Sequence, residues 1–173
     1  MSLFASKGLH FAFIEGMIPI FVKRLGRGLV AGAIATVPMS ATMQLMHRWP
    51  WPERDSLPPH QITKRITAKL GIKKHLNHEQ LTALTIANHF GFGGAMGGLY
   101  ALFAPCIIAP PVVKGLVWGS LVWALSYLGW LPVAHILPPA TEHSKRRNFL
   151  MIVAHLVWGV STALLAESGQ KDK

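Results

Sequence analysis

An uncharged, glycine-rich stretch runs from Asn88 to Ala104, NHFGFGGAMGGLYALFA. It holds five glycines, and in water each glycine inside a helix costs roughly 1 kcal/mol relative to alanine. In a membrane, small residues four apart instead allow a neighbouring helix backbone to approach closely. With its flanking residues the stretch is about long enough to cross a bilayer core. We therefore predict a membrane helix that packs against other helices.

The composition also indicates a membrane protein. Hydrophobic residues make up 51% of the 173 residues, charged residues only 14%, and the mean hydropathy is +0.36. Lys and Arg lie between the apolar runs or at their edges, as expected because a central cation costs roughly 3 kcal/mol on insertion scales. The net charge of +10 predicts contact with anionic lipid headgroups. Nucleic acid is the competing partner for such a basic chain, but no nucleic-acid-reading motif accompanies the charge, so none is predicted.

The expected fold class is all-α, an integral membrane four-helix bundle with an N-terminal interfacial helix. The interfacial segment is residues 1–27, whose apolar run is short and interrupted; the alternative is a fifth span. Counting positive charges favours the two basic loops on the cytoplasmic side. The expected spans are 28–46, 86–107, 115–137 and 149–166, with a basic polar loop at 47–85 and a polar tail at 167–173.

The basic loop contains a predicted amphipathic helix over Gln61–Leu70. Ile62, Ile66 and Leu70 share one face of it, the lysines and arginine lie elsewhere, and Gly71 supplies a C-cap. Such a helix lies along lipid headgroups, or it is simply a solvated part of the loop.

Short sequence signals also predict where the helices around this loop begin and end. The prolines between positions 52 and 59 are expected to keep its first part non-helical. Asn77 followed by Gln80 predicts a capping box, so the next helix should begin near His78.

A duplicated helical hairpin is a further hypothesis, with composition alone as the alternative explanation. The first and third spans open alike, with GLVAG from Gly28 and GLVWG from Gly115. The second and fourth each contain a histidine followed four residues later by glycine. The glycines expected at helix contacts are Gly28, Gly32, Gly93, Gly97, Gly119 and Gly159.

Four histidines fall at span ends on one side of the membrane: His47, His89, His135 and His155. Two imidazoles at one depth on different helices could ligate the iron of haem b or a transition metal, and His89 and His155 are the pair for that role. The alternative is packing and hydrogen bonding between helices.

The duplicated hairpin also predicts where the His89 and His155 side chains point. We expect both to face the bundle interior, near each other or around a polar pocket shared with Asn88, Gln44 and Ser40.

Catalysis is not predicted. The carboxylates lie outside the spans or at their edges, and the chain has no GxSxG, HExxH or P-loop motif. A single cysteine, Cys106, excludes an internal disulfide and a cysteine-based zinc site. We therefore expect no catalytic residues and no resident cofactor.

Most of residues 28–166 resembles the small bacterial inner-membrane proteins of the YagU type. The resemblance rests on GLVAGAIATVPMSATM in the first span, on the proline-broken polar loop, and on His-x3-Gly followed by Gly-x2-Tyr in the second span. The short third and fourth spans and the basic loop are where this chain departs from it. The resemblance implies a multi-pass protein of a bacterial inner membrane, in a group of unknown molecular function with one member linked to acid tolerance. No active site carries over from it.

The leading prediction is a non-enzymatic structural, accessory or stress-related component of that membrane. A homo-oligomer or a larger membrane complex is its expected setting. The alternative is a haem- or metal-binding electron-transfer subunit that uses His89 and His155. A third hypothesis, a small-solute permease, needs a wet polar path that these spans barely offer.

Overall fold

The structure is a computed structural model that describes residues 3–48 and 56–168, with side chains from residue 18 onward. Every regular element in this part is helical, so the all-α prediction is confirmed there. The long helices are α1 (Leu3–Arg48), α3 (His78–Phe103), α4 (Pro111–Ala124) and α6 (Lys145–Glu167). The shorter elements are α2 (Pro58–Lys69), η1 (Lys73–His75), η2 (Ala104–Cys106), the π-helical turn η3 (Leu125–Trp130), α5 (Leu131–Val133) and η4 (Ala140–Glu142).

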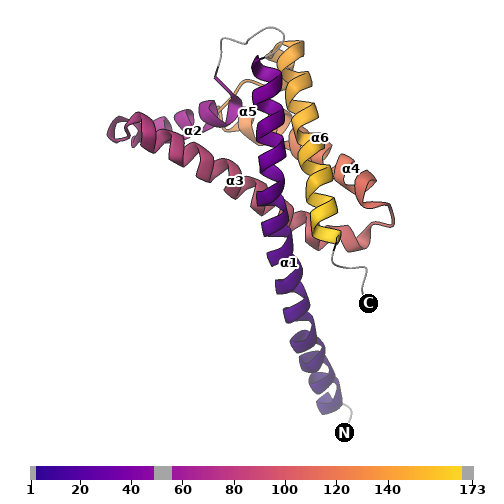
Figure 1. Cartoon of the computed structure of the whole chain (residues 1–173). Coiled ribbons are helices and arrows are strands. Elements are labelled where there is room, and N and C mark those ends of the chain that lie inside the picture. The colour runs from indigo at the N-terminus through magenta and orange to yellow at the C-terminus, as the bar shows by residue number, and fades with distance from the viewer. Residues whose placement is uncertain (1–2, 49–55, 169–173) are drawn as a thin grey trace.

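The long helices pack in pairs. In Figure 1, α1 and α6 lie side by side and run in opposite directions, while α3 crosses α1 at a steep angle. α4 packs against α6, and α2 packs on α3. The N-terminal part of α1 extends well beyond the other helices (Figure 1).

Three stretches of the described chain are long and apolar enough to cross a membrane. They are Ile18–Arg48, Pro111–Val133 and Lys145–Glu167, judged by length and composition. The expected second span at 86–107 is not among them, because Asn88, His89 and the glycines lower the hydropathy of α3. The prediction of a membrane protein is supported at this level, with three such helices rather than the four expected.

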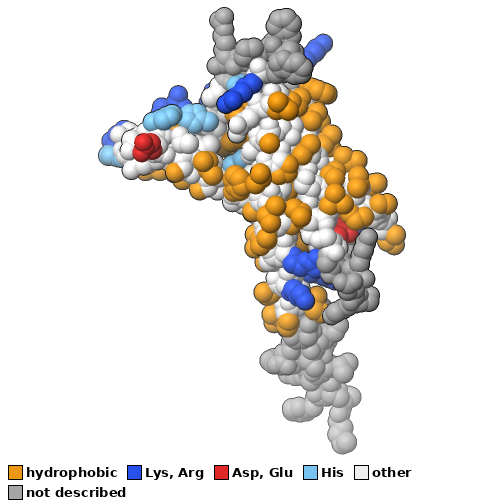
Figure 2. Space-filling view, in the orientation of Figure 1, with side chains coloured by type: hydrophobic (Ala, Val, Ile, Leu, Met, Phe, Trp, Pro, Cys, Tyr) orange, Lys and Arg blue, Asp and Glu red, His pale blue; other side chains and the backbone are white. Residues whose placement is uncertain are grey.

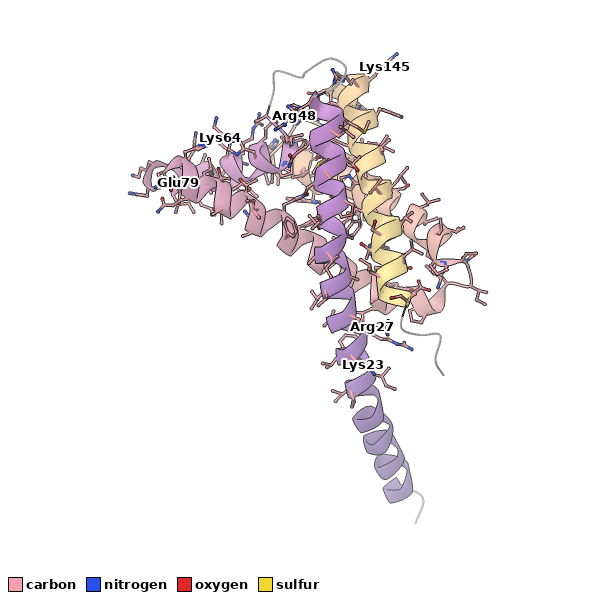
Figure 3. The ribbon with its side chains drawn as sticks, viewed as in Figure 1. Lys23, Arg27, Arg48, Lys64, Glu79 and Lys145 are labelled. Atoms are coloured by element: carbon pink, nitrogen blue, oxygen red, sulfur yellow. The ribbon has the colours of Figure 1, made fainter. Side chains whose placement is uncertain are left out.

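An apolar band covers the face of the molecule shown in Figure 2. It runs over α1, α6 and α4, with lysine and arginine side chains above it and near its lower end, where exposed apolar side chains of α1 continue past them. Figure 3 shows Lys23 and Arg27 at one end of the band and Arg48 and Lys145 at the other. This separation of apolar and cationic side chains is the pattern that a bilayer imposes.

Glycines form the contact between α1 and α3. A Cβ atom added to Gly97 would lie 2.6 Å from the Cα of Gly32. One added to Gly28 would lie 2.9 Å from the carbonyl carbon of Gly97. The two backbones therefore touch with no side chain between them, which is the close approach that small residues permit in membrane helices.

The contact between α4 and α6 is built the same way. A Cβ atom on Gly115 would lie 2.6 Å from the oxygen of Gly159, and one on Gly119 would lie 3.4 Å from the Cα of Gly159. These are the positions that the duplication hypothesis pairs with the glycines of α1 and α3.

The N-terminal segment differs from its prediction. α1 runs from Leu3 to Arg48 without interruption, so residues 1–27 do not end in a separate interfacial helix at position 27. Gly26 and Gly28 keep a negative φ. An interior glycine weakens a helix by about 1 kcal/mol but does not end it.

Around the loop the local signals are mostly confirmed. Asn77 and Gln80 form the predicted capping box, and α3 begins at His78. Gly71 has a φ of +72°, and the amide of the next residue donates to the oxygen of Thr67 at 3.0 Å, which completes a glycine C-cap for α2.

Three helix boundaries differ from the prediction. α2 starts at Pro58, because a proline in the first turn lacks only an N–H that has no intrahelical partner there. The third apolar run is helical from Pro111 to Val133 rather than over 115–137, with the π-helical turn inside it. α6 starts at Lys145 rather than at 149, because the Ser144 hydroxyl accepts from the Arg147 amide at 3.1 Å.

Candidate functional site

His155 lies on α6 and is buried, with 6% of its surface exposed. Its Nδ1 atom lies 2.7 Å from the backbone oxygen of Met151, one turn earlier in the helix. A carbonyl oxygen can only accept, so Nδ1 carries the proton and Nε2 of the neutral ring keeps its lone pair. Within the described part of the chain Nε2 has no hydrogen-bond partner. It is therefore available as an acceptor.

His89 occupies the corresponding position on α3. It lies four residues before Gly93, as His155 lies four residues before Gly159. Its ring is partly buried, and its buried Nε2 atom has no hydrogen-bond partner among the described residues. Leaving such an atom unpaired costs about 1–3 kcal/mol. Each of the two histidines thus has an Nε2 atom without a partner among the described residues.

Both histidines line one cavity of about 240 Å³. Its walls come from α1, α2, α3, α4 with the π-helical turn, α5 and α6. No charged side chain of the described residues lines it, and its aromatic lining consists of Phe92, Tyr127, Trp130 and Trp158. The cavity is therefore apolar, with a few polar groups on its walls.

The helix α2 closes one side of this cavity. Ile62, Thr63 and Ile66 line it, and the two isoleucines pack against the hydrophobic core. Lys64 and Arg65 point away and are exposed. Two of the three residues of the predicted apolar face of α2, Ile62 and Ile66, therefore cover the protein interior, whereas Leu70 is exposed.

Side-chain hydrogen bonds hold α2 over the cavity. Arg147 of α6 donates through Nη2 to Oε1 of Gln61 at 3.0 Å. At the other end of α2, Lys69 Nζ donates to the backbone oxygen of Ala134 at 2.6 Å. Cations of the two basic loops thus fix the cover of the cavity in place.

The π-helical turn η3 shapes the opposite wall. It interrupts the third apolar run, and Gly129 within it has non-helical angles of φ −108° and ψ −107°. Ser126 and Tyr127 of this turn are buried and line the cavity. The Tyr127 ring stands edge-on to the ring of His155, with 6.0 Å between their centroids. Single π-helical turns of this kind occur frequently at functional sites.

Two side chains that line the cavity also form hydrogen bonds to the glycine contact between α1 and α3. The oxygen of Gly32 accepts from Thr36 Oγ1 at 2.9 Å and from Trp158 Nε1 at 3.1 Å. These polar groups are satisfied within the protein. Nε2 of His155 and Nε2 of His89 have no hydrogen-bond partner among the described residues, which makes them the groups that a bound molecule would meet.

The predicted polar pocket is only partly present. Asn88 lines the cavity together with the two histidines. Ser40 and Gln44 do not line it, and Gln44 is exposed. His47 lies at the end of α1, and His135 lies in an exposed turn after α5, so neither joins His89 and His155.

Sequence reasoning missed several residues of the site. Thr63, Ser126 and Tyr127 come from α2 and the π-helical turn, whose placement has no short-range signal. Trp158 did have one, because it lies three residues after His155 and therefore on the same helix face.

A second polar cluster lies farther along α6 and was also missed. Glu167 pairs with Lys114 of α4 at 3.0 Å and accepts a hydrogen bond from the hydroxyl of Tyr100 on α3. Side-chain exposure is 10% for the lysine and 16% for the glutamate. The sequence does place Lys114 near the start of one apolar run and Glu167 at the end of another, and opposite charges at such positions can meet when the two helices are antiparallel.

The fold and cavity define the class of protein: a membrane protein whose described residues form helices around a cavity that none of their charged side chains lines. Residues 32–164, more than half of the chain, match the family described as "Protein of unknown function (DUF1440)". The chain belongs to this family. No curated protein and no solved structure matches it.

Proposed function

We propose that the protein is a non-enzymatic accessory component of the bacterial inner membrane and crosses it four times. The crossing segments are α1, α3, α4 with α5, and α6. The supporting observation is the spacing of the cations on α1, because a helix rises about 32 Å over the 21 residues from Arg27 to Arg48. This rise matches a bilayer hydrocarbon core of about 30 Å.

The position of α3 supports its role as the fourth crossing. In Figure 1 its first half lies beside α2, and its last turn lies near Arg27 of α1. Between these ends its glycines pack on α1. A helix whose polar residues face protein rather than lipid can cross a bilayer with a low mean hydropathy.

The cavity supports a non-enzymatic role. No carboxylate, lysine or cysteine of the described chain lines it. Ser126 has no hydrogen bond to either histidine in the described residues, so no nucleophile is paired with a base. The two levels of cations instead suit anionic lipid headgroups on both sides of the apolar band. The resemblance to YagU-type proteins supports the bacterial inner membrane as the location.

Cysteine labelling of the full-length chain tests the number of crossings. Cys106 is exposed just after α3 and should react with a membrane-impermeant maleimide from one side only. In a Cys106→Ser background, Lys74→Cys and Glu142→Cys should both react from the opposite side, which we expect to be cytoplasmic. Right-side-out and inverted vesicles give the two readouts. Labelling of Cys106 and Lys74→Cys from the same side would show that α3 does not cross.

The second candidate function is binding of a transition metal, because His89 and His155 line one cavity. The described residues hold no group of three or more potential metal ligands, so such an ion would have only these two imidazoles. Haem fits less well, because 240 Å³ is below the roughly 300–1,000 Å³ of pockets for ligands of that size.

Metal analysis and an absorption spectrum of the purified protein separate the two candidates. The metal-binding candidate predicts a stoichiometric ion that His89→Ala and His155→Ala each remove, with His135→Ala as the control outside the cavity. The leading proposal predicts the same metal content in all four proteins.

A further inference from the structure

We propose that the cavity beneath α2 binds a small, neutral phenol whose hydroxyl group donates to Nε2 of His155. Nothing else in the described residues occupies that lone pair. A phenol has the two features that the cavity requires, a flat apolar ring and one hydroxyl donor.

The size of the cavity sets the size of the ligand. A dry apolar cavity of about 150 Å³ in another protein holds benzene. A cavity of about 240 Å³ therefore accommodates a ligand of two fused rings. Four aromatic side chains in the walls provide surfaces for stacked or edge-on ring contacts.

The charge of the lining sets the charge of the ligand. Because the cavity has no ionised side chain, a charged ligand would lose its hydration without gaining a partner. A neutral hydroxyl group loses only its hydrogen bonds to water, and a new hydrogen bond to His155 replaces one of them. The donor must come from the ligand, since Nδ1 of His155 already donates to Met151.

The rim of the cavity lies on the outer surface between α3 and the π-helical turn. Phe92 and Trp130 line the cavity, yet 37% and 41% of their surfaces are exposed. Their rings lie 6.3 Å apart between centroids. A lipid-soluble ligand can enter past these two exposed apolar rings.

The test uses 6-fluoro-2-naphthol and its methyl ether, 6-fluoro-2-methoxynaphthalene, as fluorine NMR probes. Each is titrated into the full-length protein in detergent, with empty micelles as the baseline. We expect a saturable bound resonance for the naphthol and about tenfold weaker binding of the ether, the size of one lost hydrogen bond. In His155→Phe, which keeps a ring but has no acceptor, the naphthol should lose this advantage and the ether should bind as before.

Two further variants test binding in the cavity without changing His155, in case His155→Phe does not fold. Ile62→Trp places a large side chain in the cavity from α2 and should abolish binding of both probes. Arg65→Trp on the exposed face of the same helix should leave binding of both unchanged. The proposal is overturned if wild-type protein gives no saturable signal, if both probes bind equally, or if the preference for naphthol survives in His155→Phe. Because the assay does not depend on topology, such a failure leaves the labelling result intact.

Discussion

Replacing Gly97 by alanine is expected to lower the free energy of unfolding by roughly 1–3 kcal/mol, the usual range for overpacking. The added Cβ would lie 2.6 Å from the Cα of Gly32 and 2.8 Å from its nitrogen. Both atoms belong to a backbone, so no rotamer change can relieve the clash. The gain of about 1 kcal/mol that alanine brings to a helix interior offsets only part of the cost of this clash. Thermal unfolding in detergent, followed by circular dichroism, measures the effect.

Gly91→Ala is the matched control for this substitution. Gly91 lies on the same helix, and a Cβ atom there would have no neighbour within 4 Å. Its melting temperature should stay the same or rise slightly. Equal melting temperatures for the Gly97 and Gly91 variants would show that the α1–α3 contact is looser than the structure has it.

The second large effect is expected at the ion pair near the end of α6. Glu167→Gln keeps an acceptor for Tyr100 but leaves the charge of Lys114, whose side chain is only 10% exposed, unpaired. Breaking a buried pair in this way typically destabilises by about 3–5 kcal/mol. Because this pair lies partly exposed at a helix end, we expect about 3 kcal/mol. The same thermal measurement reports it.

A double variant shows whether the loss comes from the unpaired charge. Glu167→Gln combined with Lys114→Met removes both charges, so much of the stability should return. Glu142→Gln, at an exposed position, should change little. Lys114→Met alone is measured as well. If the losses of unfolding free energy in Glu167→Gln and Lys114→Met simply add in the double variant, the two side chains are not coupled and the ion pair does not stabilise the fold.

Much of the local structure could be predicted because its causes are local. The Asn77–Gln80 capping box and the Gly71 C-cap each depend on a few adjacent residues. The equal four-residue spacing from His89 to Gly93 and from His155 to Gly159 placed both histidines on faces that carry close helix contacts.

The rest of the site depends on contacts between distant residues. The alternation of isoleucine and lysine in α2 is equally compatible with lipid and with a protein interior, so the sequence could not show that α2 covers a cavity. The π-helical turn at Leu125–Trp130 has no composition of its own. The Lys114–Glu167 pair is separated by 53 residues, and only the packing of α4 on α6 brings it together.

The length of α1 has a consequence for what the molecule presents outside the bilayer. Its 46 residues form a rod about 69 Å long. Even tilted by 40°, a hydrocarbon core of about 30 Å encloses only about 26 residues of a helix. With the crossing proposed above, roughly 20 residues of α1 stand outside the core as a stalk. Pro19 lies near the base of this stalk, where a missing backbone hydrogen bond makes bending easiest. The angle at that proline sets whether the stalk reaches away from the membrane or lies down along it.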